Sequence, residues 1–456
     1  MKKIVVQLVQ DTPMWHFQGA FDDCCLRATE VKPKLDRFLL AKLDKGKLSV
    51  NDRALTSRDD VPSTWWANED KTAFNYKMRI SAESRSIIES QVPDLDRRTG
   101  QQKTDRNGKP VFRNLYPIYF ARVGADETGD MELVKMSGIR VELIVSDDRL
   151  AECIEPIIPA FFASHSFGAR QDKGFGCFRV SGAGSTGKLS GASYYFIVPA
   201  CNNSEDKYQS LFQHINYFHK VIRSGVNERG CYVKSMMYHY AKDKGDDWDK
   251  PVIRTAFNFK NVLYRFICGN VHIDELYDMD RRKVTNRDGS IKPVRNSLSD
   301  EYERNHELMG KKNLYRDALG LSTSQDWISY GNKVKTSLHG NENEEVRFKS
   351  PVDYRPVPTT DGGFIVYIII HELPDELRQS RFDISCDKSR ERLKEMKISD
   401  AISISDYFEF IYDNTWRVEL DEVEEPDCID IQPGKENREP YTLITQVFRT
   451  LNQVAK

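Results

Sequence analysis

The spacing of apolar residues predicts a chain that mixes strands and helices. Residues 3–9 are rich in β-branched side chains, and residues 138–145 begin by alternating apolar and polar positions, which favours two strands. In residues 27–43, apolar positions such as Val31, Leu35 and Leu39 recur every three or four residues, which predicts a helix. Further strands are predicted at 115–123, 177–180, 193–198, 346–351 and 364–370, and further helices at 150–162, 204–224 and 440–452. Residues 49–113 are predicted to be irregular, and residues 374–397 partly helical.

The order of these elements favours an α+β fold. Up to residue 198 the order is strand, helix, strand, strand, helix, loop and strand, with 193–198 expected to close this half, which resembles a split βαβ, ferredoxin-like plan. The length of 456 residues suits two to three domains. We therefore expect an N-terminal domain over 1–200 and a C-terminal domain over 201–456, the latter with a helical and basic insertion at about 225–345.

Composition removes several classes of protein. Aromatic residues make up 11% of the chain, which excludes overall disorder, and no apolar run approaches the roughly 20 residues of a membrane span. Nine dispersed cysteines without a Cys-x-x-Cys pair argue against zinc and disulfides, and the scattered histidines against another metal site. We expect no cofactor and a cytoplasmic location.

The net charge of -2 argues against a nucleic-acid binder that acts alone. The charges are nevertheless uneven along the chain. Six basic residues face one acid in each of the segments 97–113 and 281–295, and residues 419–430 hold seven acids and no base. The sequence leaves open whether these are interaction surfaces or solvated loops.

The segment from Phe167 to Phe178 holds the most informative motif, Phe-Gly-Ala-Arg-Gln-Asp-Lys-Gly-Phe-Gly-Cys-Phe. Its three glycines lie between a predicted helix and a predicted strand, and glycine permits positive φ and close approach of a ligand. Arg170 and Lys173 lie inside the loop, where they are suited to bind phosphate. The other reading is a tight turn with incidental charges.

A second glycine-rich segment, Gly182–Leu189, nearly matches the phosphate loop of nucleotide hydrolases. Leu189 stands where that loop needs a hydroxyl for Mg²⁺, and a strand rather than a helix is predicted to follow. We therefore interpret this segment as a glycine-serine hairpin.

Three motifs together resemble the RAMP superfamily of CRISPR-associated proteins. The glycine loop is similar to the family's C-terminal glycine-rich loop. Strand 4–9 followed by Asp11-Thr12-Pro13-Met14 is similar to its first strand with a Thr-Pro ending, and Leu26–Arg37 to its next element, a turn and basic helix. The arrangement most resembles the Cmr-type subunit of type III-B effector complexes that caps the 3′ end of the guide RNA. Arg347–Pro351 resembles an element of the second half of such proteins.

The resemblance implies two ferredoxin-like, RRM-related RAMP domains with long insertions and a non-catalytic role in antiviral defence. Its implied partners are crRNA, target RNA and other RAMP subunits, without a membrane. The RNA path implied by the motifs is lined by Arg27, Lys32, Lys34, Arg37, Gly168, Arg170, Lys173, Gly174 and Gly176. Trp15, Trp65 and Phe175 are candidates to stack on exposed bases.

Three alternatives stay open at the level of sequence. The first is a crRNA-processing endoribonuclease of the same superfamily with His16 or His165 as the general base. The second is a nucleotide-binding enzyme that uses Gly182–Lys188, and the third is a scaffold that binds only protein.

Overall fold

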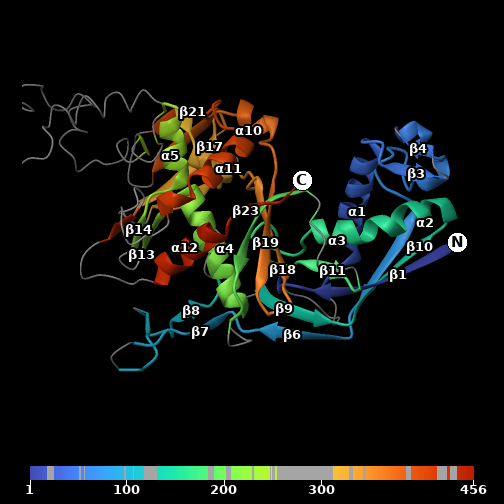
Figure 1. Cartoon of the computed structure of the whole chain (residues 1–456), viewed down its shortest axis with the longest axis horizontal. Coiled ribbons are helices and arrows are strands. Elements are labelled where there is room, and N and C mark those ends of the chain that lie inside the picture. Colours follow the sequence, from blue (N-terminus) through green and yellow to red (C-terminus); the bar gives the residue numbers. More distant parts are fainter. Residues whose placement is uncertain are drawn as a thin grey trace, which may run out of the picture. The chain divides into compact units, whose positions relative to one another are not determined.

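The computed structural model organises the chain into two compact units (Figure 1). The first unit combines Met1–Phe218, Val352–Ile370 and Glu439–Lys456, and the second combines His219–Pro351 and His371–Arg438. The structure describes residues 1–455 except 18–24, 51–52, 56, 97–98, 106, 118–130, 183–188, 190, 202–206, 229–230, 247, 249–251, 254–311, 328–331, 342–345, 387–391, 419–428 and 432–438.

The first sheet of unit 1 has the spatial order β11-β1-β10-β5, and all of its neighbours are antiparallel. Its strands are β1 (Lys2–Gln10), β5 (Tyr76–Ser81), β10 (Ile139–Val145) and β11 (Phe178–Val180). The helices α1 (Ala28–Leu43), α2 (Asp148–Ile154) and α3 (Ile158–Ser164) share its hydrophobic core. In chain order this gives strand, helix, strand, strand, helix and strand, and the last strand lies beside the first.

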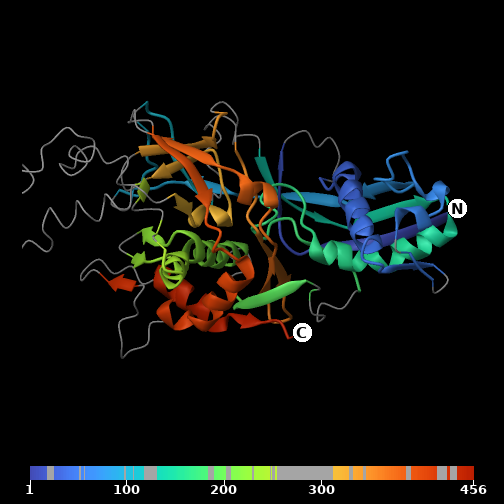
Figure 2. The same ribbon diagram turned by 90° about the horizontal axis from the view of Figure 1, so that it is seen from above.

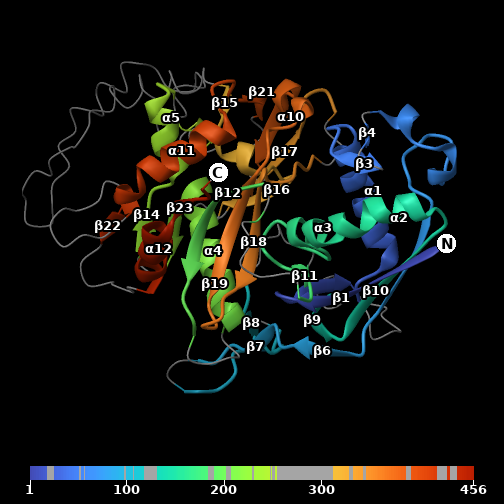
Figure 3. The ribbon, with the colours of Figure 1, turned by 45° about the vertical axis from the view of Figure 1, so that its right-hand side comes forward.

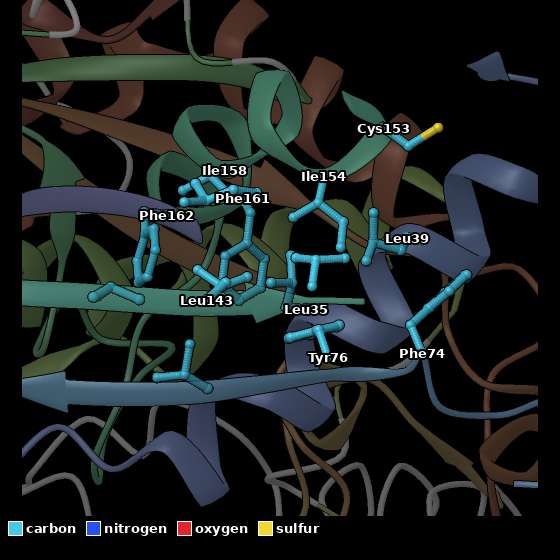
Figure 4. Packing of buried hydrophobic residues seen from close by; sticks show 14 of the residues in the cluster. Leu35, Leu39, Phe74, Tyr76, Leu143, Cys153, Ile154, Ile158, Phe161 and Phe162 are labelled. Carbon is cyan, nitrogen blue, oxygen red and sulfur yellow. The ribbon is translucent and has the colours of Figure 1, made fainter. Parts of the chain in front are cut away.

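Strand alternation explains why this sheet has one buried face. Along β10, Val141 and Leu143 are buried, whereas Arg140 and Ile144 are exposed. The buried residues pack against the apolar stripe of α1, which includes Leu35 (Figure 4). Burying a side chain of this size stabilises the fold by roughly 2 kcal/mol, so the stripe holds the helix on the sheet.

The second sheet of unit 1 repeats the same plan with segments that are far apart in sequence. Its members in chain order are β12 (Ala192–Val198), α4 (Lys207–Arg223), β18 (Val352–Pro358), β19 (Phe364–Ile370), α12 (Glu439–Thr450) and β23 (Asn452–Gln453). The spatial order is β18-β19-β12-β23, again with the last strand beside the first (Figures 2 and 3). Phe218 of α4 lies 5.3 Å from Phe196 of β12 and 5.2 Å from Phe448 of α12, ring centre to ring centre, which joins both helices to the sheet.

Smaller sheets complete unit 1. The sheet β2-β9-β6 consists of β2 (Met14–Phe17), β9 (Met131–Ser137) and β6 (Ser84–Ile88). Two further pairs are β3 (Leu48–Val50) with β4 (Arg53–Leu55), and β7 (Gln91–Pro93) with β8 (Phe112–Asn114).

Unit 2 contains two sheets and three described helices. The five-stranded sheet has the order β15 (Asn313–Leu314), β21 (Arg392–Ile398), β20 (Phe382–Cys386), β17 (Asn332–Leu338) and β16 (Ser324–Trp327). The other sheet is β13 (Val226–Glu228), β14 (Cys231–Val233) and β22 (Ile429–Ile431). The helices are α5 (Met236–Asp243), α10 (Asp375–Gln379) and α11 (Ile404–Asp413).

The α+β prediction is confirmed, as are most of the regular elements. Three details are wrong. Residues 346–350 form no strand, because the strand begins at Val352. Residues 49–113 contain β5 of the main sheet, and β12 joins the second sheet rather than closing the first. Residues 374–397 are partly helical as predicted, since they contain α10, and two strands follow it. The compact units also differ from the linear division at residue 200, because 352–370 and 439–456 complete a sheet of unit 1.

Candidate RNA-binding surface around the glycine loop

The glycine loop, residues 167–176, is bonded both to β2 and to the segment that joins β1 to β2. The Gly176 amide donates to the Pro13 carbonyl at 2.9 Å, and the Ala169 amide donates to the Trp15 carbonyl at 3.0 Å. These bonds make the loop a fixed extension of the two sheets rather than a free connection.

Thr12, two residues after the end of β1, binds the glycine loop through its hydroxyl. Its hydroxyl donates to the Gly174 carbonyl at 2.7 Å and accepts from the Cys177 amide at 3.0 Å. The side chain is fully buried and gives both backbone groups a partner, and the Cys177 thiol also donates to the Gly174 carbonyl at 3.4 Å. The Thr-Pro motif thus holds the glycine loop in place.

The loop glycines are required by the protein's own backbone. All three have positive φ, and a Cβ on Gly176 would lie 1.9 Å from the Phe167 carbonyl oxygen. A Cβ on Gly168 would lie 2.5 Å from the Trp15 oxygen, and one on Gly174 would lie 2.9 Å from the Pro356 ring. The sequence suggested that these glycines allow a ligand to approach the backbone closely. In the structure, the atoms that approach them belong to other segments of the protein itself.

The lysines of the predicted RNA path make contacts inside the protein. Lys34 Nζ donates to the Ser166 carbonyl at 2.9 Å and to Gln171 Oε1 at 2.7 Å, which joins α1 to the loop. Lys32 Nζ pairs with Asp36 at 2.8 Å. Lys173 is buried and pairs with Asp172 at 3.1 Å. Lys34 and Lys173 therefore support the loop from within, whereas Lys32 also donates to the Phe74 carbonyl and ties α1 to the chain before β5.

The arginines of the predicted path lie closer to solvent. Arg27 stands at the N-terminal end of α1 and Arg37 on the same helix, and both are exposed. Arg170 is half-buried, has φ of 59°, and lies with its guanidinium 4.6 Å from the centre of the Trp15 ring. The loop and α1 are tied together, since the Gly168 amide donates to Glu30 Oε1 at 2.8 Å. The structure therefore brings the cations of α1 and of the loop onto neighbouring elements.

Arg355 of β18 was not identified from the sequence. It is 3% exposed, and its guanidinium donates to the carbonyls of Phe162 and Ala163 at the end of α3 and to the Ser166 hydroxyl. A positive charge at a helix C-terminus is favourable. The one sequence signal is a charged residue inside a strand, and a buried position tolerates such a residue only with partners.

The three aromatic candidates for base stacking are buried. Trp15, Trp65 and Phe175 are 8%, 1% and 0% exposed. Phe175 stacks on Phe212 of α4 with ring centres 3.7 Å apart. These rings therefore act in the core, and the stacking role is not supported in this conformation.

The two candidate general bases differ in their surroundings. The His165 ring packs against Phe38 and Phe161, and burial lowers the pKa of His165 to about 4. Burial, followed by the charges of Arg27 and Arg85, lowers the pKa of His16. Both rings are thus neutral at neutral pH.

Several sequence features lie outside the described residues. They are 183–188 of the phosphate-loop-like segment, 118–123 of a predicted strand, the basic segment 281–295, most of the insertion at 225–345, and most of the acidic segment 419–430. In the described part of the chain, no group of three or more His, Cys, Asp or Glu residues is placed to hold a metal ion. Among those same residues, no helix is both long and apolar enough to cross a bilayer.

Comparison with known proteins gives two matches to sequence models of protein families. The Cmr1 N-terminal domain matches residues 1–226, and the Cmr1 C-terminal domain matches residues 232–425. The crystal structure of Cmr1 from Pyrococcus furiosus in its apo form is similar at 11% identity and a TM-score of 0.34, over 83% of this chain and 91% of that chain. No curated protein matches the sequence.

Proposed function

This chain belongs to the Cmr1 family of RAMP subunits of type III-B CRISPR effector complexes, and from that premise we propose that it is an RNA-binding subunit without catalytic activity. It holds the 3′ region of the crRNA and the matching end of the target RNA, and so takes part in antiviral defence. The observation that carries the proposal is the joining of the glycine loop to α1, which gathers Arg27, Arg37 and Arg170 on adjacent elements of one unit.

Strand order supports the assignment of two ferredoxin-like domains. Both main sheets of unit 1 arise from strand, helix, strand, strand, helix and strand, and in both the fourth strand lies beside the first. That arrangement is the split βαβ plan. On this assignment, unit 2 consists of two insertions into the second domain, 219–351 and 371–438.

The RNA contacts are assigned according to exposure. Arg27 and Arg37 neutralise phosphates directly, because their side chains are exposed. Arg170 offers one face of a guanidinium whose other face lies on Trp15. Lys34, Lys173 and the glycines maintain the shape of the surface, because they are already engaged within the protein.

The environment of His165 supports a role without catalysis. A histidine with a pKa of about 4 is a weak base at neutral pH, and its Nδ1 lies 3.0 Å from the Phe161 carbonyl. His16 keeps the endoribonuclease alternative open, because its lowered pKa leaves it neutral and able to accept a proton. Metal-independent cleavage of repeat RNA that is abolished in His16→Ala would favour this alternative.

The test compares two double charge-reversal variants. One changes arginines at the start and in the middle of α1, and the other changes lysines just after its last residue. We expect Arg27→Glu with Arg37→Glu to weaken crRNA binding by about tenfold or more and to reduce the slope of affinity against salt by about 1 for each phosphate that the protein no longer neutralises. Lys45→Glu with Lys47→Glu is the matched control, because these exposed lysines follow the other end of α1.

The outcome separates the RNA-binding role from a scaffold that binds only protein. Equal crRNA affinity and salt dependence in both double variants would contradict the proposal and favour the scaffold. A charge reversal at Lys173 would not isolate an RNA contact, because that side chain is buried beside Asp172 and its replacement would disturb the loop itself.

A further inference from the structure

The second sheet of unit 1 has one face that points away from its helices. Phe196 of β12 is fully buried, and its ring centre lies 5.3 Å from that of Phe218 of α4. Tyr195 and Ile197, its neighbours along the strand, point to the opposite face, because successive side chains of a strand alternate. Ile197 is 44% exposed, so part of this opposite face lies in solvent.

Two tyrosines form a pair at the centre of this face. Tyr195 of β12 lies directly opposite Tyr367 of β19, and these two strands are the inner strands of the sheet (Figure 3). The ring centres are 6.1 Å apart and the rings are tilted by 49°, so the rings are not stacked on each other. Both side chains are half-buried. Each ring therefore keeps surface in water, unlike the buried rings of Trp15, Trp65 and Phe175.

The tyrosines belong to a row that crosses the whole sheet, here named the tyrosine row. Arg355 of β18 lies opposite Tyr367, and Asn452 of β23 lies opposite Tyr195. Asn452 is exposed, and its side-chain amide offers N–H donors for the edge of a base. The row thus has aromatic rings in its middle and a polar group at its open end.

The other end of the tyrosine row meets the start of the glycine loop. Arg355 donates to the Ser166 hydroxyl, and the Ser166 carbonyl accepts from Lys34 of α1 at 2.9 Å. Neighbouring strands lie about 5 Å apart, so Tyr367 and Tyr195 follow Arg355 at about 5 and 10 Å across the sheet. The row therefore begins at the same segment that α1 contacts, which makes it continuous with the proposed RNA-binding surface.

We propose that Tyr195 and Tyr367 stack on unpaired bases in the 3′ region of the crRNA. A four-stranded sheet with aromatic side chains on its inner strands is a common platform for single-stranded RNA. Stacking tolerates any sequence, because every base has a π-face, and this suits a subunit that holds guides of different sequence. The inference rests on the proposed function and adds a base-stacking site to its phosphate contacts.

The test measures the crRNA affinity of the full chain in two double variants at the same positions. Tyr195→Leu with Tyr367→Leu removes the rings and keeps apolar side chains on the strands. We expect it to weaken crRNA binding about tenfold or more. The slope of affinity against salt stays unchanged, because stacking neutralises no phosphate.

Tyr195→Phe with Tyr367→Phe is the matched control, because it keeps both rings and removes only the hydroxyls. We expect this variant to bind crRNA within about twofold of the unmodified chain. Thermal unfolding verifies that both double variants fold. Equal affinity of the leucine variant and the unmodified chain would overturn the proposal, as would equal weakening in the leucine and phenylalanine variants.

Photochemical cross-linking locates the contact in the unmodified chain and so does not depend on the folding of a variant. The probe is crRNA that carries 5-iodouridine in its 3′ region. A cross-link to Tyr195 or Tyr367 supports the proposal, whereas cross-links only to other residues would contradict it. A photo-reactive phenylalanine analogue at position 367 that links only to another protein in the assembled complex would show that a protein occupies this face, and would overturn the stacking role.

The same measurements separate failure of this inference from failure of the proposed function. If the leucine variant binds crRNA like the unmodified chain while Arg27→Glu with Arg37→Glu binds it weakly, only the stacking site is wrong. If the unmodified chain binds no crRNA, the proposed function itself fails.

Discussion

Gly176 shows at the scale of one residue how the sequence motif acts. Its φ is 65°, and the space in front of its Cα is taken by the carbonyl of Phe167, to which the chain returns within the same loop. The Gly176 carbonyl also accepts from the Phe167 amide at 2.9 Å. Any side chain here would have to break the contact that closes the loop.

We expect Gly176→Ala to reduce the free energy of unfolding by about 3 kcal/mol or more, since it combines a left-handed φ with a steric clash. Gly191→Ala is the control, because its φ is 90° and nothing lies within 4 Å of an added Cβ. It is expected to cost only about 1–2 kcal/mol. Denaturant titration of both variants measures the difference, and equal reductions would show that the clash is relieved by movement of the loop.

The buried ring of His165 makes the free energy of unfolding depend on pH. The folded chain holds the pKa of His165 at about 4, below the ordinary histidine value of 6.5, because the ring is largely buried. The unfolded chain therefore takes up a proton first as the pH falls. The stabilisation is present above about pH 6.5 and is lost as the pH falls to about 4, by on the order of 2 kcal/mol for a ring that is not fully buried.

His165→Asn tests this link, because asparagine does not titrate. We expect the difference in unfolding free energy between the unmodified chain and the variant to change by about 2 kcal/mol between pH 7 and pH 4.5. A constant difference across this range would mean that His165 titrates alike in both states.

At the scale of elements, Arg355 joins β18 of the second sheet to the end of α3. We expect Arg355→Met to lower the free energy of unfolding by about 3 kcal/mol, since it leaves the carbonyls of Phe162 and Ala163 without this donor in a buried place. Arg140→Met is the control: Arg140 is an exposed strand arginine that pairs with Glu142, and its replacement is expected to cost less than about 1 kcal/mol. Chemical denaturation measures the free energy of unfolding of both variants, and similar reductions in the two would contradict the role of Arg355.

The elements also show what could be read from the sequence. Periodicity identified β1, α1, β10, β12, α4 and β19, because each repeats apolar residues at the spacing of its own backbone. It did not give the partner of β12, since alternation defines the faces of a strand but not its neighbours in a sheet. β5 was missed for a related reason: its residues are half-buried or exposed except Tyr76, so it carries a weak apolar signal.

The candidate site was predictable in location and less so in role. The motifs identified the glycine loop and α1 as parts of one RNA path, and the structure joins the two elements through Lys34 and Glu30. Sequence alone does not distinguish a lysine that meets a ligand from one that binds a carbonyl or carboxylate of its own chain. Lys34 and Lys173 are of the second kind, because the folded loop places acceptors within their reach.

At the scale of the whole molecule, unit 1 is built from three separate segments. A fragment of residues 1–226 would contain β12 and α4 without β19 on one side and without β23 and α12 on the other. We expect this fragment to bind a hydrophobic dye, because buried residues such as Phe196 and Phe218 lose their cover, while the first sheet and its three helices, which lie wholly within the fragment, keep a cooperative transition.

The control for the fragment is the full chain under the same conditions, with near-UV circular dichroism and thermal unfolding as the measurements. A fragment of residues 1–226 that binds as little dye as the full chain would contradict the discontinuous unit. It would favour instead the linear division near residue 200.

The discontinuity of unit 1 also constrains how the chain folds while it is being synthesised. The ribosome releases β12 long before β19, its neighbour in the sheet, and α12 and β23 come last of all. At typical rates of elongation, the edge of β12 waits roughly 10–30 s for β19. Throughout that interval an apolar strand has no partner from its own sheet, so the nascent chain depends on chaperones or on early subunit contacts to escape aggregation.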